Sequence, residues 1–546
     1  MVQKNAQPNI LRKISVSILF QTSDFQKSCQ KLSQGFFNML PELHQTIQTP
    51  LGSHNCRLGL EQFVVDVERE IMRLRQTIRE ANTSINECTS ISTLPPELIT
   101  EIFILACHPE YDASREGLGK HWEMWPLRLG AVCKAWRDLA WSSSRLWSSI
   151  VFVSRSRSIS DLEDVLDSWI SRSGNHPLLI HIDAPCLASP CVESMIGSLI
   201  STAPRWKNVS LHLSEEIFHH FVKCDCFPIL EQLCFKNPDQ DRARPREWNI
   251  GKSLDIFRSS NMPQIKHLHL PKYIKCFHIW PSALSSLTTF SVGYIYGDQA
   301  YHILRCTSNS LQEFVAEQFV SDEYSDREEH RTLILPILRS LVLKDAIANY
   351  NTGLNQLLSK ISTPSIEELT IEFYDCDPTP IPSMPDFMSN LSRSLRRLHI
   401  TCCLEDCTFT IGCILKVESL LELYFTGGQQ SCKALVDSLG PVAPKESSGE
   451  HLPLLETFTM TVDMCFLPVE GLQEMLAYRC SGVSTTCVRL KTARIETCKC
   501  CQDGINVLRR ALVDSKSDIT FATPVDYYCL SHFFHPVCSE TNLSSR

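Results

Sequence analysis

Three stretches near the middle of the chain share one pattern: LPILRSLVLKD at 335–345, PSIEELTIEFYD at 364–375 and RSLRRLHITCC at 393–403. Each has a small residue or proline at its start, then an apolar residue, two mostly polar positions and an alternating apolar–x–apolar end. Such alternation is typical of a β-strand that buries one of its two faces. The pattern therefore predicts a set of short, similar strands that follow one another along the chain.

The same theme recurs on both sides of these stretches, and its spacing is regular. The central apolar positions Phe314, Leu341, Leu369, Leu398 and Leu423 are separated by 27, 28, 29 and 25 residues. This period has room for one strand and one helix per unit, so each unit must stack on its neighbours to bury its apolar face. Further copies are PLLIHID at 177–183, WKNVSLHLS at 206–214, FPILEQLCFK at 227–236, MPQIKHLHLP at 262–271, SSLTTFSVGY at 285–294, NSLQEFVAEQF at 309–319, ESLLELYFTG at 418–427 and LPLLETFTMTVD at 452–463, with amphipathic helical segments such as 160–171, 354–362 and 471–480 between strands.

These repeats resemble irregular leucine-rich repeats, and the resemblance implies an α/β solenoid of strand–helix units over 160–546. The asparagine or cysteine of the family's repeat signature is mostly absent, and the repeat lengths vary. A doubly wound α/β domain is the competing interpretation, and it would need long continuous parallel strands. With the helical segment upstream, the fold class is a mixed α+β or α/β solenoid.

Upstream of the repeats, 94–151 is rich in apolar residues at helical spacing. It opens LPPELITEIF, resumes as LRLGAVCKAWRDLA from Leu127, and closes RLWSSIVF. Prolines 95 and 96 suit the first turn of a helix, and Glu97 lies at the positive end of the helix dipole. Two short helices cannot hide this much apolar surface in each other, so either the rest of the chain or a partner must cover some of it.

The segment 91–152 resembles the F-box, a helical module that docks a Skp-family adaptor of cullin–RING ubiquitin ligases. The matching elements are Leu94, Pro95, Glu97, Leu98, Ile102 and Phe103, then Val132-Cys133-Lys134-Ala135-Trp136-Arg137, then Leu146-Trp147. An insertion at 108–126, with Trp122 and Trp125, separates the two halves by more than the family module usually allows. Cys133 and Leu139 are expected to pack internally. The resemblance implies adaptor contact, or shaping of the adaptor surface, by Leu94, Pro95, Leu98, Ile102, Phe103, Val132, Trp136 and Trp147.

A helix is predicted over 56–86, after a leader at 1–55 that has no sustained period and is expected to be poorly ordered. Its apolar residues follow steps of four and three, the spacing of a coiled-coil seam. Two interpretations stay open: the helix packs back onto the F-box-like module, or it forms a weak homodimer through 60–78. The seam consists of Leu60, Val64, Val67, Ile71, Leu74 and Ile78.

The composition is that of a globular protein, and it predicts binding to neither nucleic acid nor membranes. Of 546 residues, 43% are hydrophobic and 21% charged, and the net charge of −9 gives no basic surface for nucleic acid. No apolar run approaches the ~20 residues that span a bilayer, and the N-terminus lacks the pattern of a secretory signal peptide. We therefore expect a cytoplasmic or nuclear protein whose 26 cysteines stay reduced, most of them as small core residues.

No catalytic or metal-binding pattern stands out. Gly251-Lys252-Ser253 ends like a phosphate-binding loop, but the leading glycine is replaced by Arg246. The thiols of Cys498, Cys500 and Cys501 are too closely spaced for the usual zinc knuckles, and we expect no metal and no cofactor. The polar stretches 321–330 and 441–450 are predicted as solvated loops.

These observations predict a non-catalytic substrate receptor of a Skp–cullin–F-box ubiquitin ligase. The helices would dock the adaptor and, through it, the cullin–RING complex, while the repeat array would bind an unknown target protein. A leucine-rich-repeat scaffold without ubiquitin transfer and an α/β enzyme are the two alternatives. The scaffold would still bind an adaptor-like partner through the helices, whereas the enzyme would not need this docking surface.

Overall fold

The structure is a computed structural model of the whole chain, and it divides into two compact units, 1–99 and 100–546. Residues 1–53 of the predicted leader, 108–124 of the insertion, and 321–330 and 442–450 of the two predicted polar loops lie outside the described residues. The residues that the structure describes are 54–107, 125–153, 162–184, 190–213, 220, 227–236, 262–270, 284–320, 332–344, 352–373, 381–402, 408–441, 451–462, 467–481, 487–497, 501–512 and 518–522.

The described part of the first unit consists mainly of one long helix, α3, which covers His54–Glu87. It spans 34 residues, or about 50 Å at the rise of an α-helix. A short 3₁₀ turn, η1 (Ser90–Thr93), follows and contacts α3. The helix predicted over 56–86 is therefore present, with bounds that extend slightly further at each end.

The second unit begins within helix α4 (Pro96–Cys107). It continues with α5 (Trp125–Val132), α6 (Lys134–Ser142) and the 3₁₀ turn η3 (Ser144–Ser148). The apolar residues from Leu129 to Ala140 keep helical spacing throughout, but Cys133 has extended backbone angles, φ −156° and ψ 172°, and separates α5 from α6. That segment is therefore two short helices that pack against each other.

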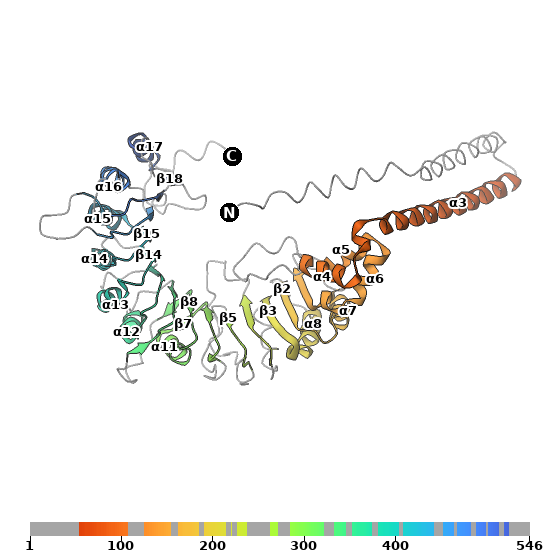
Figure 1. Cartoon of the computed structure of the whole chain (residues 1–546), viewed down its shortest axis with the longest axis horizontal. Coiled ribbons are helices and arrows are strands. Elements are labelled where there is room, and N and C mark those ends of the chain that lie inside the picture. Colours follow the sequence, from red (N-terminus) through yellow and green to blue (C-terminus); the bar gives the residue numbers. More distant parts are fainter. Residues whose placement is uncertain are drawn as a thin grey trace. The chain divides into compact units, whose positions relative to one another are not determined.

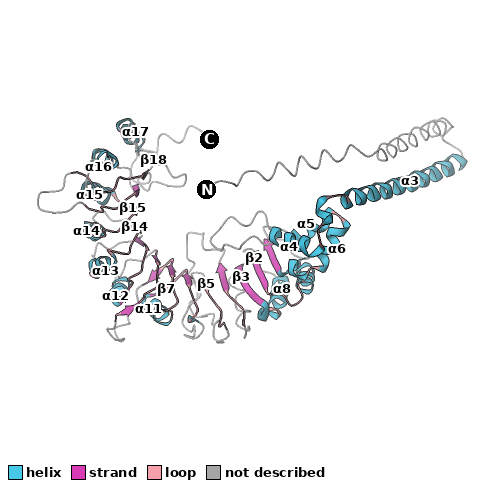
Figure 2. Cartoon of the chain, in the orientation of Figure 1, coloured by secondary structure: helices cyan, strands magenta, loops and turns pink. Residues whose placement is uncertain are grey.

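A long parallel sheet forms the body of the second unit (Figures 1 and 2). Its strands follow one another in chain order without a reversal, whereas a doubly wound domain reverses its strand order at a switch point. Two small parallel pairs, β7 (Ile295–Tyr296) with β9 (Phe319–Val320) and β10 (Leu333–Ile334) with β12 (Ile361–Ser362), flank it. The 14 strands of the main sheet are β1 (Ser149–Val153), β2 (Leu178–Ala184), β3 (Trp206–Leu213), β4 (Gln232–Lys236), β5 (His267–Leu270), β6 (Thr289–Val292), β8 (Glu313–Ala316), β11 (Ser340–Leu343), β13 (Glu368–Phe373), β14 (Arg397–Cys402), β15 (Glu422–Gly427), β16 (Thr457–Val462), β17 (Thr492–Glu496) and β18 (Asp518–Ala522).

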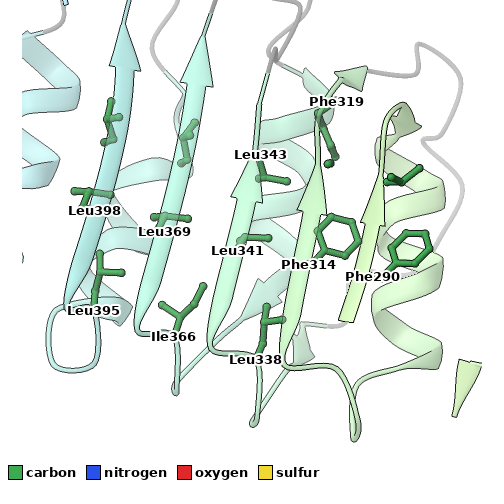
Figure 3. Close-up of a cluster of buried hydrophobic side chains, with 14 of the residues drawn as sticks. Phe290, Phe314, Phe319, Leu338, Leu341, Leu343, Ile366, Leu369, Leu395 and Leu398 are labelled. Carbon is green, nitrogen blue, oxygen red and sulfur yellow. The ribbon is translucent and has the colours of Figure 1, made fainter. Parts of the chain in front are cut away.

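The register of this sheet confirms the predicted repeat. Phe314 is paired with Leu341, Leu341 with Leu369, Leu369 with Leu398, and Leu398 with Leu423 on successive strands. All five side chains are fully buried. Figure 3 shows four of them in a row across neighbouring strands, Phe314, Leu341, Leu369 and Leu398. The spacing of the repeat thus sets the register, because a shift by one residue would turn each apolar side chain to the opposite face.

Helices line one face of the sheet (Figure 2). The first two of these helices contact each other, and so do successive helices further along the array. Their inward side chains and those of the strands form one continuous core from Ile150 to Leu512. The described part of the array is thus an open, mixed α/β layer structure compatible with a solenoid. The helices are α7 (Leu162–Arg172), α8 (Pro190–Ser201), α11 (Gly297–Cys306), α12 (Thr352–Lys360), α13 (Met384–Leu391), α14 (Thr408–Ile414), α15 (Gln429–Leu439), α16 (Val469–Ser481) and α17 (Gln502–Ala511), with the 3₁₀ turn η4 (Ala203–Arg205).

The boundary between the helical segment and the array differs from the prediction. Residues 149–152, assigned from sequence to the end of the F-box-like module, belong to β1, which pairs with β2 from Ser149 opposite Leu179 onward. The side chain of Ile150 is part of the array core. The helical segment and the strand–helix array are therefore joined through a shared sheet and not through a linker.

Candidate functional site

Helices α4 and α6 are held together by an internal aromatic contact. Phe103 of α4 is almost fully buried and lies against Trp136 of α6, with ring centroids 4.7 Å apart and an interplanar angle of 59°. At the surface, Arg145 of η3 donates a hydrogen bond to the Glu101 carboxylate of α4 at 2.7 Å. These contacts fix α4 against the rest of the helical segment and close the apolar core beneath it.

Other large apolar side chains of the same helices point to solvent. Leu105 is 75% exposed, Val132 at the end of α5 is 56% exposed, and Ile102 is 43% exposed. Leu98, one helical turn before Ile102 on α4, is 52% exposed. Scattered single apolar residues are common on protein surfaces, but three within two turns of one short helix make a concentrated exposed apolar surface.

The residues predicted from the F-box resemblance separate into an outward and an inward set. Leu98, Ile102, Val132 and Pro95 are exposed, and Leu94, which caps η1, is half-buried. Phe103 and Trp147 are buried in the chain's own core, and Trp136 is half-buried. The residues inferred from the F-box resemblance did not include Leu105, which follows Ile102 by three residues in the sequence.

Trp147 joins the helical segment to the first strand–helix repeat of the array. Its ring is 2% exposed and makes edge contacts with Trp141 of α6 at 5.4 Å and Trp169 of α7 at 4.8 Å. The indole Nε1–H donates to the Ala140 carbonyl at 2.8 Å. The guanidinium of Arg172 lies 5.0 Å from the Trp147 ring centroid. Trp147 therefore shapes the module from inside and does not present its ring to a partner.

Cys133 acts as the N-cap of α6. Its Sγ accepts a hydrogen bond from the Trp136 backbone N–H at 3.4 Å, which satisfies one of the unpaired donors at the start of the helix. Both Cys133 and Leu139, which were predicted to pack internally, are half-buried. The Val-Cys-Lys-Ala-Trp run thus combines an exposed valine, a capping thiol and an inward-facing tryptophan.

A second surface of interest is the face of the sheet turned away from the helices. On most strands its residues alternate with the buried ones and are mainly polar. Cys234, which was expected in the core, lies on this face and is half-buried. The register aligns one row of this face across five strands, as His181, Ser210, Cys234, His269 and Ser291.

Histidines on this row are held neutral. His269 Nδ1 lies 2.8 Å from the Ser291 hydroxyl, and burial lowers the pKa of His269 to about 4, with nearby Lys236 acting in the same direction. Burial also lowers the pKa of His181 and His399 on the same face. At neutral pH these imidazoles are therefore mainly uncharged.

Some charged and polar side chains on the same face are paired across neighbouring strands. Arg397 donates to Glu368 on the neighbouring strand at 3.0 Å, and Asp183 meets His212 Nδ1 at 2.6 Å. Paired surface charges contribute little to stability, but they set which partner surface is complementary. The exposed sheet face is thus a varied polar surface with specific donors and acceptors.

The part of the chain that the structure describes contains neither a candidate metal cluster nor a candidate membrane-spanning helix. Within those residues no group of three or more His, Cys, Asp or Glu side chains is arranged to hold a metal ion. The thiols of Cys498 and Cys500, weighed above as zinc ligands, lie outside the described residues. Among the described helices, none combines the length and the apolar character required to cross a bilayer.

Comparison with known proteins adds no family to this description. No protein-family model matches the chain, and no curated protein matches it.

Proposed function

We propose that the chain is the substrate-recognition subunit of a Skp–cullin–F-box ubiquitin ligase, in which α4 to α6 dock the adaptor. One observation carries the proposal. Phe103 and Trp136 close the core beneath α4, while Ile102 and Leu105 stay exposed on the same helix. The fold does not bury these apolar side chains, so a partner that covers them gains their burial free energy, about 25 cal/mol per Å² of apolar surface.

The strand–helix array supplies the second half of the proposed function. Its continuous core makes a rigid support, and its polar sheet face presents histidines, paired charges and hydroxyls to a target protein. The repeats are proposed to be irregular leucine-rich repeats. The chain would carry out no covalent chemistry; it would hold a target near the ubiquitin-conjugating enzyme and raise the effective concentration of the target's lysines.

The test is co-purification of the full chain with the endogenous Skp-family adaptor and cullin from eukaryotic cells. The wild-type chain should retain both. The double variant Ile102→Glu/Leu105→Glu should lose both, because two buried unpaired charges in the interface cost several kcal/mol. The matched control is Ile334→Glu/Val507→Glu, which places the same charges on exposed apolar positions of the array, 61% and 48% exposed, and should keep the adaptor.

Two results would reject the proposal. A wild-type chain that captures no adaptor would remove the docking function, and equal capture by both double variants would place docking elsewhere. Adaptor binding without cullin would instead favour the non-ligase scaffold, in which the same helices dock the adaptor without ubiquitin transfer. Localisation in the cytoplasm or nucleus, where this machinery operates, belongs to the same proposal.

A further inference from the structure

Helix α3 carries an apolar stripe that is accessible over 61–86. Every described side chain from 61 to 86 is exposed or half-buried. Val64 and Ile78 are each 53% exposed, Ile71 is 43% exposed and Ile85 is 38% exposed. An isolated helix gains little stability from propensity alone, so a helix of this length with an uncovered stripe needs a packing partner.

The stripe follows a heptad repeat that extends beyond the seam predicted at 60–78. Continuing the steps of four and three adds Ala81 and Ile85, so the pattern runs from Leu60 to Ile85. Position a is then always β-branched, and position d includes Leu60 and Leu74. β-Branched residues at a with leucine at d favour parallel, two-stranded coiled coils over higher oligomers. The a positions are Val64, Ile71, Ile78 and Ile85, and the d positions are Leu60, Val67, Leu74 and Ala81.

The charges beside the seam are complementary in the same arrangement. Glu70 falls at position g and Arg75 at position e of the following heptad. In a parallel dimer, a residue at g approaches the residue five positions later on the partner helix, so Glu70 of each copy meets Arg75 of the other. Both side chains are on the accessible surface of α3, where Glu70 also lies 3.6 Å from Arg73 of its own helix.

We infer that α3 pairs in parallel with α3 of a second copy of this chain. The inference goes beyond the proposed function, since it concerns a surface in the first unit and does not depend on the adaptor. A dimer would carry two receptor units, so a target with two recognition sites, or an assembly of targets, would be held with an avidity that one copy lacks.

The first experiment measures the mass of the purified full chain by size-exclusion chromatography with light scattering at micromolar concentration. One chain has a mass of 62.0 kDa, and the wild type should show twice that value. Ile71→Glu/Ile78→Glu places two charges in the seam and should shift the mass to 62.0 kDa. Val65→Glu/Met72→Glu adds the same charges at exposed b positions, 47% and 61% exposed, and should remain dimeric.

A second experiment tests the parallel orientation. Glu70→Arg sets two arginines against each other at both sides of the seam, and it should weaken dimerisation by about tenfold in sedimentation equilibrium at low salt. The double variant Glu70→Arg/Arg75→Glu restores opposite charges in a parallel pair and should recover most of that loss.

Several outcomes would overturn the inference: a monomeric or trimeric wild type, equal dissociation of the seam and control variants, or no recovery in the double variant. These results are distinguishable from a failure of the proposed function. Adaptor capture is expected to be unchanged in the α3 variants, and the dimer mass is expected to be unchanged in Ile102→Glu/Leu105→Glu.

Discussion

Replacement of Trp147 by alanine tests whether this residue joins the helical segment to the array. The side chain is 2% exposed, and a tryptophan buries roughly 150–250 Å². At about 25 cal/mol per Å² this corresponds to about 4–6 kcal/mol, and measured tryptophan-to-alanine changes in cores are about 3–5 kcal/mol. Loss of the Nε1–H bond leaves the Ala140 carbonyl without that donor, a penalty of about 1 kcal/mol that lies within this range. We therefore expect Trp147→Ala to lower the free energy of unfolding by about 4 kcal/mol.

Hydrogen exchange and urea unfolding of the purified full chain measure this loss. In Trp147→Ala, backbone amides of α6 and α7 should exchange faster by two to three orders of magnitude, about 1.4 kcal/mol for each factor of ten. Trp147→Phe keeps a ring between Trp141 and Trp169 and should lose only about 1–2 kcal/mol. Leu105→Ala, at a position 75% exposed, should stay within about 0.5 kcal/mol of wild type. A Trp147→Ala chain as stable as Leu105→Ala would refute the assignment.

Three other changes test separate contacts. Gly130→Ala should destabilise the α5–α6 pair by about 1–3 kcal/mol in urea unfolding, because a Cβ would come within 2.1 Å of the Trp141 ring. An unchanged midpoint of the urea transition would show that the two helices approach each other less closely. Arg479→Leu should lower the free energy of unfolding by about 3 kcal/mol, since the buried guanidinium donates to the carbonyls of Leu439 and Leu452. Arg479→Lys should recover part of this loss. Equal losses in the two variants would show that the planar guanidinium group is not needed. Burial holds the pKa of His269 at about 4 against 6.5 when exposed, so the unfolded chain binds more protons between these values and stability should fall as pH drops from about 6.5 towards 4. His269→Asn should flatten that slope, by at most about 3 kcal/mol across the window, and an unchanged slope would place the acid sensitivity elsewhere.

The repeat could be read from sequence because its signal is local. Each strand alternates buried and accessible residues, and the distance between central positions leaves room for one helix. Phe314 and Leu341 therefore pair as the spacing predicts. The last strand, Asp518–Ala522, was not predicted, because five residues without the repeat's flanking pattern carry too little periodicity to be distinguished from a loop.

The helical segment was harder to predict because its details depend on tertiary contacts. The periodicity from Leu129 to Ala140 continues through Cys133 without a break, yet the backbone is extended at Cys133 and its thiol caps α6. Likewise, a pattern match cannot tell which apolar residues face inward. Trp147 is buried because Trp169, 22 residues later, packs against it, whereas Leu105 is 75% exposed.

Isothermal titration of the purified full chain with a purified Skp-family adaptor tests the proposed docking surface most directly. The wild-type chain should bind with a negative heat-capacity change, the signature of apolar burial, and Ile102→Glu/Leu105→Glu should show no heat of binding while its circular dichroism stays that of wild type. A folded wild-type chain that shows no affinity for the adaptor at micromolar concentrations would contradict the account.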